Sequence, residues 1–549
     1  MAEGPTTETK VMWEPKASVF KTVGVLMNNI IKYFLLALRM VTCVVFFYAP
    51  FRKKKLLPPI KSHLLKMSAT QLVQKLKSKE VKSVEIVKAF INRIEDVNPI
   101  INSVVEDRFK EAIKEAEDVD AIIRDSKDLD RLFEEKPLFG VPLSVKETVA
   151  VKGMSNNSAR SRVSSNIAEK DADVVHRLKN AGAIPLVVTN TPELCFYFET
   201  YNSRTGRTVN PYDTRRTPGG SSGGEAAIIS SAGSVIGIGS DIAGSIRIPA
   251  SFCGIFGHKP TPGYISNDGH IPTSDDPDWN KYFTLGPLTR YAEDLPLMMK
   301  IMTNRQRFEK LKFDEKVDLS KIKVYYMYGE GPKSLLQDAP IFSVKKAVKE
   351  AVDGLVKHLK CHSEKVQLEC LRNSLLLSTL IMRMKGIENV QQRDENPDNW
   401  GIVDVVKVIF KKLTLQTSAS ISLVLWGPLK YFINRFPQPY REKAENKQRY
   451  CRQALQKLLG DDGVLIYPTF PWEAPFTDTM GYQVTNVSYC TLFTTTGLPV
   501  SQVPITLNND GLPIGVQVVA GPHQDRLCIA VAKALEKIKG GWVPPPEIG

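Results

Sequence analysis

From about residue 137 onward, short runs of continuous apolar residues alternate with stretches of helical periodicity. A strand that is buried on both faces is apolar along its whole length, whereas a strand with one wet face alternates apolar and polar residues. Buried strands that alternate with helices predict an α/β fold, in which a large, twisted, mostly parallel or mixed sheet is covered by helices. The runs expected to form strands are 142–145, 183–189, 234–240, 464–467, 499–505 and 513–520.

Helices are predicted before and between these strands. Ser68 has the sequence context of a capping box, which opens a helix. A second helix is expected to begin near Ser83 and to end at Pro99, and residues 102–124 continue with helical periodicity. Residues 300–460 are largely helical in pattern, and no internal repeat is visible. Other expected helices are 173–181, 245–252 and 527–538.

The composition is that of a globular protein with an uneven charge. The chain has 549 residues, of which 43% are hydrophobic and 24% charged. Its net charge is +14, and +8 of this lies in residues 1–66, where it flanks an apolar run. Such a distribution favours a membrane surface that carries acidic lipids. Nucleic acid is not an expected partner, because zinc-finger spacing, aromatic-basic RNA motifs and long basic helices are all missing from the sequence.

Eight cysteines are scattered along the chain without a CxxC pair. No group of Cys and His has the spacing of a zinc site. Single thiols in a chain of this length are typical of a reducing compartment. Neither a metal nor an organic cofactor is expected.

The amino-terminal apolar run is predicted to attach the protein to a membrane. Residues 33–49 contain nine Leu, Val or Phe, which contribute about −3 to −5 kcal/mol to insertion, against about +2.5 to +3.5 kcal/mol for Arg39. A spanning helix would leave the basic flank 52–55, and everything after it, in the cytoplasm on an intracellular membrane. The alternatives are a helix that lies in the membrane interface, and an ordinary buried helix.

Two sequons, at Asn156 and Asn486, are expected to be unglycosylated because the domain faces the cytoplasm.

These patterns divide the chain into three parts. Residues 1–56 form the membrane anchor and its basic flank, 57–66 form a linker with two prolines, and 67–549 form one large folded domain. Within that domain, 300–460 is a more divergent helical region. Two of its stretches mix apolar residues with lysine, as either a membrane-contacting cap over the substrate or a pair of amphipathic core helices would: 402–413 and 421–433.

Three separated segments carry the chemistry. Lys146 ends the run PLSVK, Ser221 lies in TPGGSSGGE, and Ser245 lies in GSDIAGSIRIP. In this order and spacing they resemble the amidase-signature family, and the resemblance extends from about residue 67 to 542. It implies the amidase-signature fold for the domain, with Ser245 as nucleophile, Ser221 as proton bridge behind a cis peptide bond, and Lys146 as base.

The chemistry of these residue types agrees with that resemblance. A serine hydroxyl is a poor nucleophile until a base takes its proton. A lysine can be that base only where its neutral form is populated, and burial favours the neutral form. Lys146 lies at the end of an apolar run, where burial is expected.

The family also implies donors for the oxyanion and residues that support the loop. The expected oxyanion hole consists of backbone N–H groups from Ile242, Ala243, Gly244 and Ser245. Most members have glycine where this chain has Ala243, which disturbs the hole only if the position needs a positive φ. Three further residues have expected supporting roles: Ser222 orients Lys146, and Asp241 and Arg247 fix the loop.

Three other functions stay open from the sequence. Residues 219–223 also fit the nucleophile elbow of α/β-hydrolases, which would make Ser221 the nucleophile and need a later histidine such as His523. A component of a glutamine amidotransferase belongs to the same family, although the apolar amino-terminal segment disfavours it. A third alternative is a membrane protein that kept the fold without the activity.

Within the family, the chain looks most like the fatty-acid amide hydrolases of the second type. The resemblance lies in residues 193–196 and 255–260, together with the amino-terminal run. It implies cleavage of fatty-acid amides, either primary amides or N-acylethanolamines, to a free fatty acid and ammonia or an amine. Phe196, Tyr197 and Phe198 are candidates for the acyl channel. The expected partners are the lipid bilayer and the substrate, and a homodimer is left open.

Overall fold

The computed structural model describes residue 33 and residues 48–548, except 161–165, 275–277, 314, 330–336, 373 and 385–437. Most of the predicted anchor at 33–49 and both stretches of the predicted cap, 402–413 and 421–433, lie outside the described residues. Within the described part of the chain, no helix combines the length and apolar character needed to cross a bilayer. The anchor helix is therefore not shown and stays a prediction.

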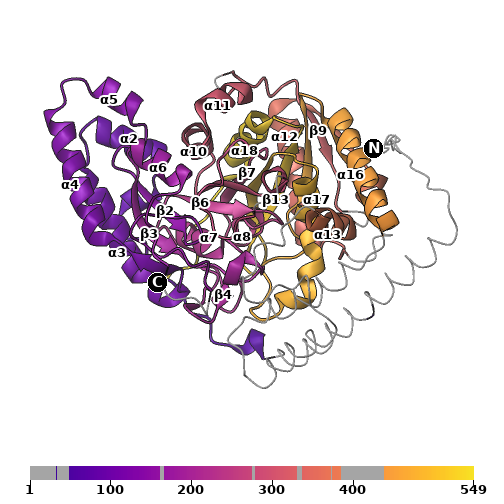
Figure 1. Ribbon diagram of the computed structural model, residues 1–549, viewed down its shortest axis with the longest axis horizontal. Helices are drawn as coiled ribbons and strands as arrows, with labels where there is room; N and C mark the ends of the chain where they lie inside the picture. Colours follow the sequence, from indigo (N-terminus) through magenta and orange to yellow (C-terminus); the bar gives the residue numbers. More distant parts are fainter. Residues whose placement is uncertain are drawn as a thin grey trace.

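One mixed sheet organises the domain (Figure 1). Strands β2, β3 and β6 run parallel to one another, as do β9, β10 and β11, while the strands between these two groups pair antiparallel. From edge to edge, the eleven strands formed by the described residues are β1 (Val104–Asp107), β3 (Ile184–Thr189), β2 (Pro142–Lys146), β6 (Ile236–Asp241), β8 (Thr284–Thr289), β7 (Phe256–Lys259), β12 (Val500–Leu507), β13 (Pro513–Ala520), β11 (Gly463–Pro468), β9 (Lys323–Tyr326) and β10 (His362–Lys365). A separate small hairpin pairs β4 (Tyr201–Asn202) with β5 (Gly206–Arg207).

Helices cover this sheet, and in Figure 1 α3 and α4 lie together at one side of the molecule with α16 at the other. The described α-helices are α2 (Ala69–Lys77), α3 (Ser83–Ile101), α4 (Phe109–Asp125), α5 (Leu129–Glu135), α6 (Asp173–Asn180), α7 (Gly223–Ser230), α8 (Arg247–Phe252), α9 (Trp279–Tyr282), α10 (Asp294–Met302), α11 (Arg305–Leu311), α12 (Phe342–Leu359), α13 (Ser374–Met384), α16 (Gln438–Leu459), α17 (Ser488–Thr495) and α18 (Asp525–Lys539). Short 3-10 helices are η1 (Ala49–Phe51), η2 (His63–Lys66), η3 (Glu193–Cys195), η4 (Glu369–Leu371) and η7 (Met480–Val487).

Strand β13 shows why the central strands are mostly apolar. Consecutive side chains of a strand point to opposite faces. Val516 and Val518 face the main core, which also contains residues of α12 and α18. Gln517 points to the other face, where it accepts a hydrogen bond from Arg247 of α8, and Val519 packs there with residues of α17. Both faces are covered, so neither set of side chains reaches water.

The predicted elements are largely confirmed, with three corrections. Residues 104–107 form the edge strand β1 instead of continuing a helix. Pro99 lies inside α3, which ends two residues later, at Ile101. Proline has no N–H, so α3 lacks the hydrogen bond that residue 99 would otherwise donate to the carbonyl four residues before it. The region 300–460 is not helical throughout, because it supplies β9 and β10 to the main sheet.

Candidate active site

Two parallel strands end beside each other and bring a lysine against two serines. Lys146 is the last residue of β2, and Ser240 lies near the end of the neighbouring strand β6. Ser221 stands just before α7, which packs on both strands. The Lys146 amine, Nζ, lies 2.7 Å from Ser221 Oγ and 3.0 Å from Ser240 Oγ. The predicted contact between base and proton bridge is therefore present.

Burial makes Lys146 a credible base. Its side chain has no exposed surface, and this desolvation lowers its pKa below the ordinary value of a lysine. Cys195, Asp241 and Glu225 act in the opposite direction but do not cancel the effect of burial. The neutral amine, which can accept a proton, is correspondingly easier to form.

The bridge serine is held by a glycine-rich turn that leaves no room for side chains. The peptide bond between Gly220 and Ser221 is cis, as the resemblance implied. A Cβ atom added to Gly220 would lie 2.7 Å from the Tyr197 carbonyl oxygen, and one added to Gly219 would lie 2.8 Å from the Cα atom of Pro249. Glycine is needed at both positions because the surrounding backbone approaches so closely.

Ser245 lies at the opposite side of this turn. Its carbonyl accepts a hydrogen bond of 3.2 Å from the Ser222 N–H, which ties the nucleophile segment to the residue next to Ser221. Ser245, the predicted nucleophile, is 5% exposed, which is more than Ser221 at 1% or the fully buried Lys146. Among the described residues, no side-chain hydrogen bond forms to the Ser245 hydroxyl. The structure thus joins Lys146 to Ser221 directly and Ser245 to the same turn through the backbone.

The predicted oxyanion hole is only partly available. The Gly244 N–H donates to Asp241 Oδ1 at 2.9 Å and is therefore already occupied. The N–H groups of Ile242, Ala243 and Ser245 donate to no partner within the described residues, so these three remain as candidate donors. Loss of one oxyanion donor typically costs about 10²–10³ in kcat, so the remaining three matter.

The backbone of this turn explains why Ala243 is tolerated. Gly244 has a φ of +109°, whereas Ala243 is not among the residues with positive φ. A Cβ atom at Gly244 would also lie 2.7 Å from the Cβ atom of Cys490. The turn therefore requires glycine at 244 and accepts alanine at 243.

A buried ion pair fixes the turn, as predicted for Asp241 and Arg247. Arg247 Nη2 and Nε donate to the two carboxylate oxygens of Asp241 at 2.8 and 3.0 Å, and neither residue is exposed. The Ile246 N–H donates to the same carboxylate at 3.1 Å. Burial alone would raise the pKa of Asp241, but the Arg247 guanidinium outweighs burial and holds this pKa below its ordinary value. The carboxylate thus stays ionised and organises the chain on both sides of Ser245.

Ser240 contacts the Lys146 amine, a contact that the sequence predicted for Ser222. Ser240 was not expected at the site from the sequence. The Ser222 hydroxyl lies against the Ser240 backbone, 3.5 Å from its carbonyl oxygen and 3.4 Å from its nitrogen, whereas Lys146 contacts the Ser240 hydroxyl. The prediction that Ser222 orients Lys146 is thus not what the contacts show. Pairing of β6 beside β2 was the signal that could have found Ser240, because it places Ser240 near Lys146 across the two strands.

Ser240→Ala is expected to lower kcat/KM about 2- to 10-fold without affecting the fold. The variant removes one of the two hydroxyls that position the Lys146 amine, and a single hydrogen bond is worth about 0.5–1.5 kcal/mol. Steady-state kinetics on an amide substrate measures this loss. Ser234→Ala is the matched control, because Ser234 is buried and bonds the Ile236 carbonyl instead of the lysine. Equal activities of the two variants would contradict a role for Ser240.

The nucleophile-elbow alternative lacks its histidine. His523 Nδ1 contacts the Tyr264 hydroxyl at 2.9 Å, and no contact joins His523 to Ser221 in the part of the chain that the structure describes. A different Ser–His–Asp chain does exist, in which His258 contacts Ser501 at 2.9 Å and Asp525 at 3.1 Å. All three of its side chains are fully buried, so no substrate reaches them.

An apolar cluster adjoins the nucleophile turn. Ile248, three residues after Ser245, and Cys490, which touches the Gly244 position, both belong to it. Tyr197 and Phe198 pack against this cluster, whereas Phe196 packs against the main core. We call this group the acyl cluster, and its buried members are Ile248, Phe252, Phe470, Ala474, Met480, Val487 and Cys490.

A family profile described as Amidase matches residues 85–529, which is well over half of the chain. The chain therefore belongs to the amidase-signature family and is an amide hydrolase. Among curated proteins, fatty-acid amide hydrolase 2 of Homo sapiens is 41% identical over 496 residues, which cover 89% of this chain and 92% of that protein. A component of the glutamyl-tRNA(Gln) amidotransferase of Carboxydothermus hydrogenoformans is 28% identical, with coverage of 86% and 97%.

Solved structures support the fold. The structure of 6-aminohexanoate cyclic dimer hydrolase aligns with a TM-score of 0.70 at 24% identity, covering 88% of this chain and 99% of that one. A fatty acid amide hydrolase structure aligns with a TM-score of 0.67 at 22% identity, covering 87% and 86%. At these identities the likeness concerns the fold alone.

Proposed function

We propose that the protein hydrolyses fatty-acid amides by a Ser–Ser–Lys mechanism while attached to a membrane. The observation that carries the mechanism is the 2.7 Å contact between the fully buried Lys146 amine and Ser221. Similarity to fatty-acid amide hydrolase 2 over most of the chain supports the substrate class.

In the proposed acylation step, neutral Lys146 accepts the proton of Ser221 while Ser221 takes the proton of Ser245. The Ser245 oxygen then bonds to the amide carbon, and the carbonyl oxygen becomes an oxyanion that accepts from the free N–H groups at 242, 243 and 245. When the tetrahedral intermediate collapses, the C–N bond breaks and the proton returns through Ser221 to the leaving nitrogen. The products of this step are ammonia or an amine and an acyl ester on Ser245.

Water completes the cycle through the same groups. It loses a proton to the relay as it attacks the acyl ester, and the proton returns to the Ser245 oxygen when the C–O bond breaks. The products are the free fatty acid and the regenerated serine. Lys146 is neutral again at the end, so no net proton is consumed by the relay.

The acyl cluster supports a long apolar acyl group. It adjoins the turn that carries Ser245, because Ile248 and Cys490 contact that turn, and its members are apolar side chains. Each buried methylene of an acyl chain contributes about 0.8 kcal/mol, so an apolar wall beside the nucleophile favours long chains over short ones. Tyr197 and Phe198 are the proposed aromatic members of that wall.

Phe198→Ala tests the substrate assignment. The variant should reduce kcat/KM for a long-chain amide roughly 5- to 150-fold, because about 1–3 kcal/mol of apolar contact is lost, and should leave a short-chain amide nearly unchanged. Phe196→Ala is the matched control, since Phe196 packs away from the acyl cluster. Kinetics on amides of increasing acyl length provides the measurement. An equal loss for both chain lengths, or the same selectivity in both variants, would contradict the proposed channel.

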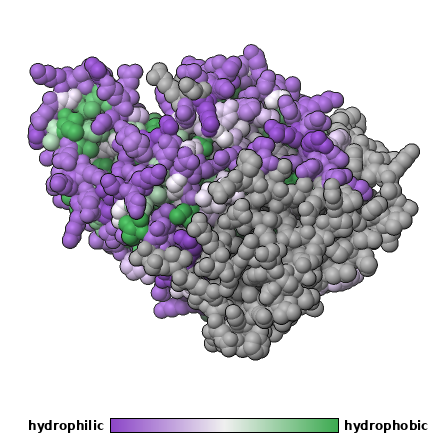
Figure 2. Space-filling model, viewed as in Figure 1, coloured by the Kyte–Doolittle hydropathy of each residue, from purple (hydrophilic) through white to green (hydrophobic). Residues whose placement is uncertain are grey.

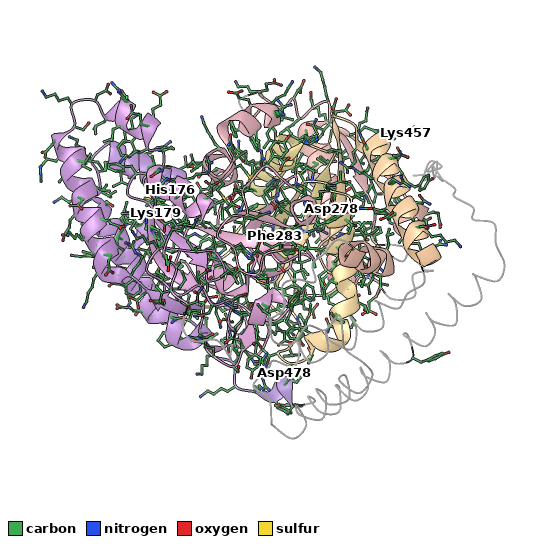
Figure 3. All side chains as sticks on the ribbon, viewed as in Figure 1. His176, Lys179, Asp278, Phe283, Lys457 and Asp478 are labelled. Carbon is green, nitrogen blue, oxygen red and sulfur yellow. The ribbon has the colours of Figure 1, made fainter. Side chains whose placement is uncertain are left out.

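The basic flank after the predicted anchor supports the proposed membrane attachment. Arg52 bonds Asp478 at 3.2 Å and Thr477 at 2.7 Å, which fixes the flank to the folded domain at the end marked by Asp478 in Figure 3. Phe51 is 82% exposed and Lys53 is also exposed beside it. An exposed aromatic beside lysines suits the interface of a membrane with acidic lipids. The face seen in Figure 2 is mainly hydrophilic where it is described, with smaller hydrophobic patches at the left and near the centre.

The two sequons do not test the proposed cytoplasmic orientation as the sequence suggested. Asn156 and Asn486 are both buried, at 4% and 0% exposure. Their side-chain amides bond the Glu147 carbonyl and Asp338. The folded domain leaves no open surface for a glycan at either position, so topology is better tested by protease protection of the intact membrane-bound protein.

A further inference from the structure

Glu225 is a buried carboxylic acid that the mechanism above does not use. It lies on α7, three residues after Ser222, and has no exposed surface. Its two oxygens accept hydrogen bonds from Ser144 Oγ at 2.7 Å and from Thr189 Oγ1 at 2.9 Å. Both donors belong to the strands that carry and flank the base.

The strand register places this carboxyl beside Lys146. Ser144 and Lys146 are two residues apart on β2, so their side chains point to the same face. Thr189 of β3 is the direct cross-strand partner of Lys146. A group bonded to both Ser144 and Thr189 therefore lies close to the lysine side chain.

The sheet leaves a space for the carboxyl. Gly237 of β6 is the cross-strand partner of Ser144, and a Cβ atom at Gly237 would overlap the Glu225 carboxylate oxygen. Any other residue at 237 would displace the acid. Glycine at this position, together with the two hydroxyl donors, indicates that the site is built to hold a carboxyl group.

We propose that Glu225 is a positioning residue for the reaction, whose carboxylate raises the proton affinity of the Lys146 amine and so keeps the buried lysine basic enough to take the serine proton. This inference rests on the proposed Ser–Ser–Lys mechanism. Burial pushes the lysine toward its neutral form, and a base whose proton affinity is too low cannot draw a proton from a hydroxyl. A nearby carboxylate offsets part of that effect.

The charges around the lysine single out Glu225 for this role. Four groups interact electrostatically with Lys146. Cys195, Asp241 and Glu225 raise the pKa of Lys146. His270 is repelled instead, since the charge of Lys146 lowers the pKa of His270. Asp241 is already neutralised by Arg247, whereas Glu225 forms no ion pair with Lys or Arg among the described residues. Burial raises the pKa of Glu225, and its two hydroxyl donors and Lys146 offset only part of this effect, so that the pKa stays raised at about 8. Its charge is thus coupled to that of the lysine.

Glu225→Gln is the test, read from the pH dependence of kcat/KM. Glutamine has nearly the same shape, and its amide can still bond the hydroxyls of Ser144 and Thr189, but it has no negative charge. The value of kcat/KM rises with pH as Lys146 loses its proton, and this rise is the acidic limb of the pH profile. A carboxylate that stabilises the ammonium raises the pKa of Lys146 and so places the acidic limb at higher pH. The variant should therefore shift the acidic limb to lower pH by about one unit. Thr189→Val, which removes one donor to the carboxylate, should shift the limb in the same direction by a smaller amount.

Glu536→Gln is the matched control. Burial also raises the pKa of Glu536, to about 7, but this carboxyl accepts from the Ala292 N–H, far along the chain from the base. Its substitution should leave the limb in place. If the limbs of the Glu225→Gln and Thr189→Val variants both superimpose on that of the wild type, the proposal is overturned and Glu225 is merely structural. If Lys146→Ala keeps its activity instead, the Ser–Ser–Lys mechanism itself fails, and the two failures are thereby distinguished.

Discussion

Lys146→Ala is expected to lower kcat/KM by about 10³-fold or more. Without the amine, Ser221 has no group to which it can pass the proton of Ser245, so the nucleophile stays a neutral hydroxyl. Ser221 and Ser240 lose their shared donor, but both hydroxyls can bond to water that enters the small space left by the lysine. Steady-state kinetics on a fatty-acid amide measures the loss, and circular dichroism with a thermal melt verifies that the protein folds.

Lys259→Met is the matched control for this experiment. Lys259 is also fully buried, and burial lowers its pKa to about 7, but within the described residues its amine bonds only the Pro260 carbonyl, at 3.0 Å. Methionine fills a similar volume, so activity within a few-fold of the wild type is expected. A Lys146→Ala protein that keeps more than a tenth of the wild-type activity would rule out the lysine as base.

Asp241→Asn is expected to destabilise the protein by about 3–5 kcal/mol. The substitution leaves the Arg247 guanidinium charged and uncompensated in a site without exposed surface. It also weakens the acceptor that holds the N–H groups of Gly244 and Ile246, so activity should fall together with stability. Because the folded-state pKa of Asp241 is lowered, its contribution to stability is present at neutral pH and is lost as the pH falls through that lowered pKa. The variant should lack this part of the acid sensitivity.

Denaturant unfolding of the wild type and the variant over a range of pH measures both effects. Asp353→Asn is the matched control, because Asp353 pairs with Lys349 at 2.7 Å on the exposed face of α12. An exposed pair of this kind contributes less than about 1 kcal/mol. A loss for Asp241→Asn no larger than that of the control would show that the buried pair does not organise the nucleophile turn.

The sequence predicts the fold best where a strand is buried on both faces, because such a strand appears as a run of mostly apolar residues. The run 513–520 is apolar except for Gln517 and forms β13 with the predicted ends. Strand β1 was missed because Val104–Asp107 is a partly exposed edge strand between two helices, and the charged residues around it imitate helical periodicity. Strands β9 and β10 were missed for a similar reason, since β10 is the edge strand, β9 lies next to it, and both are partly exposed.

At the site, the sequence identified residues that belong to motifs and missed those placed by pairing. Lys146 and Ser221 meet as their motifs implied. Ser240 and Glu225 were not assigned to the lysine, because their proximity depends on the register of β2 with its neighbours and not on spacing along the chain. The occupation of the Gly244 N–H by Asp241 was equally invisible, since it depends on the path of a turn.

The measurement that tests the central claim most directly is labelling of the folded protein with a fluorophosphonate, followed by peptide mass mapping of the adduct. The mechanism requires Ser245 to be the activated serine that forms the covalent bond, with Ser221 only passing the proton. An adduct on Ser245 that disappears in the Lys146→Ala protein is the predicted result. An adduct on Ser221, or a folded and active protein that is labelled at neither serine, would contradict it.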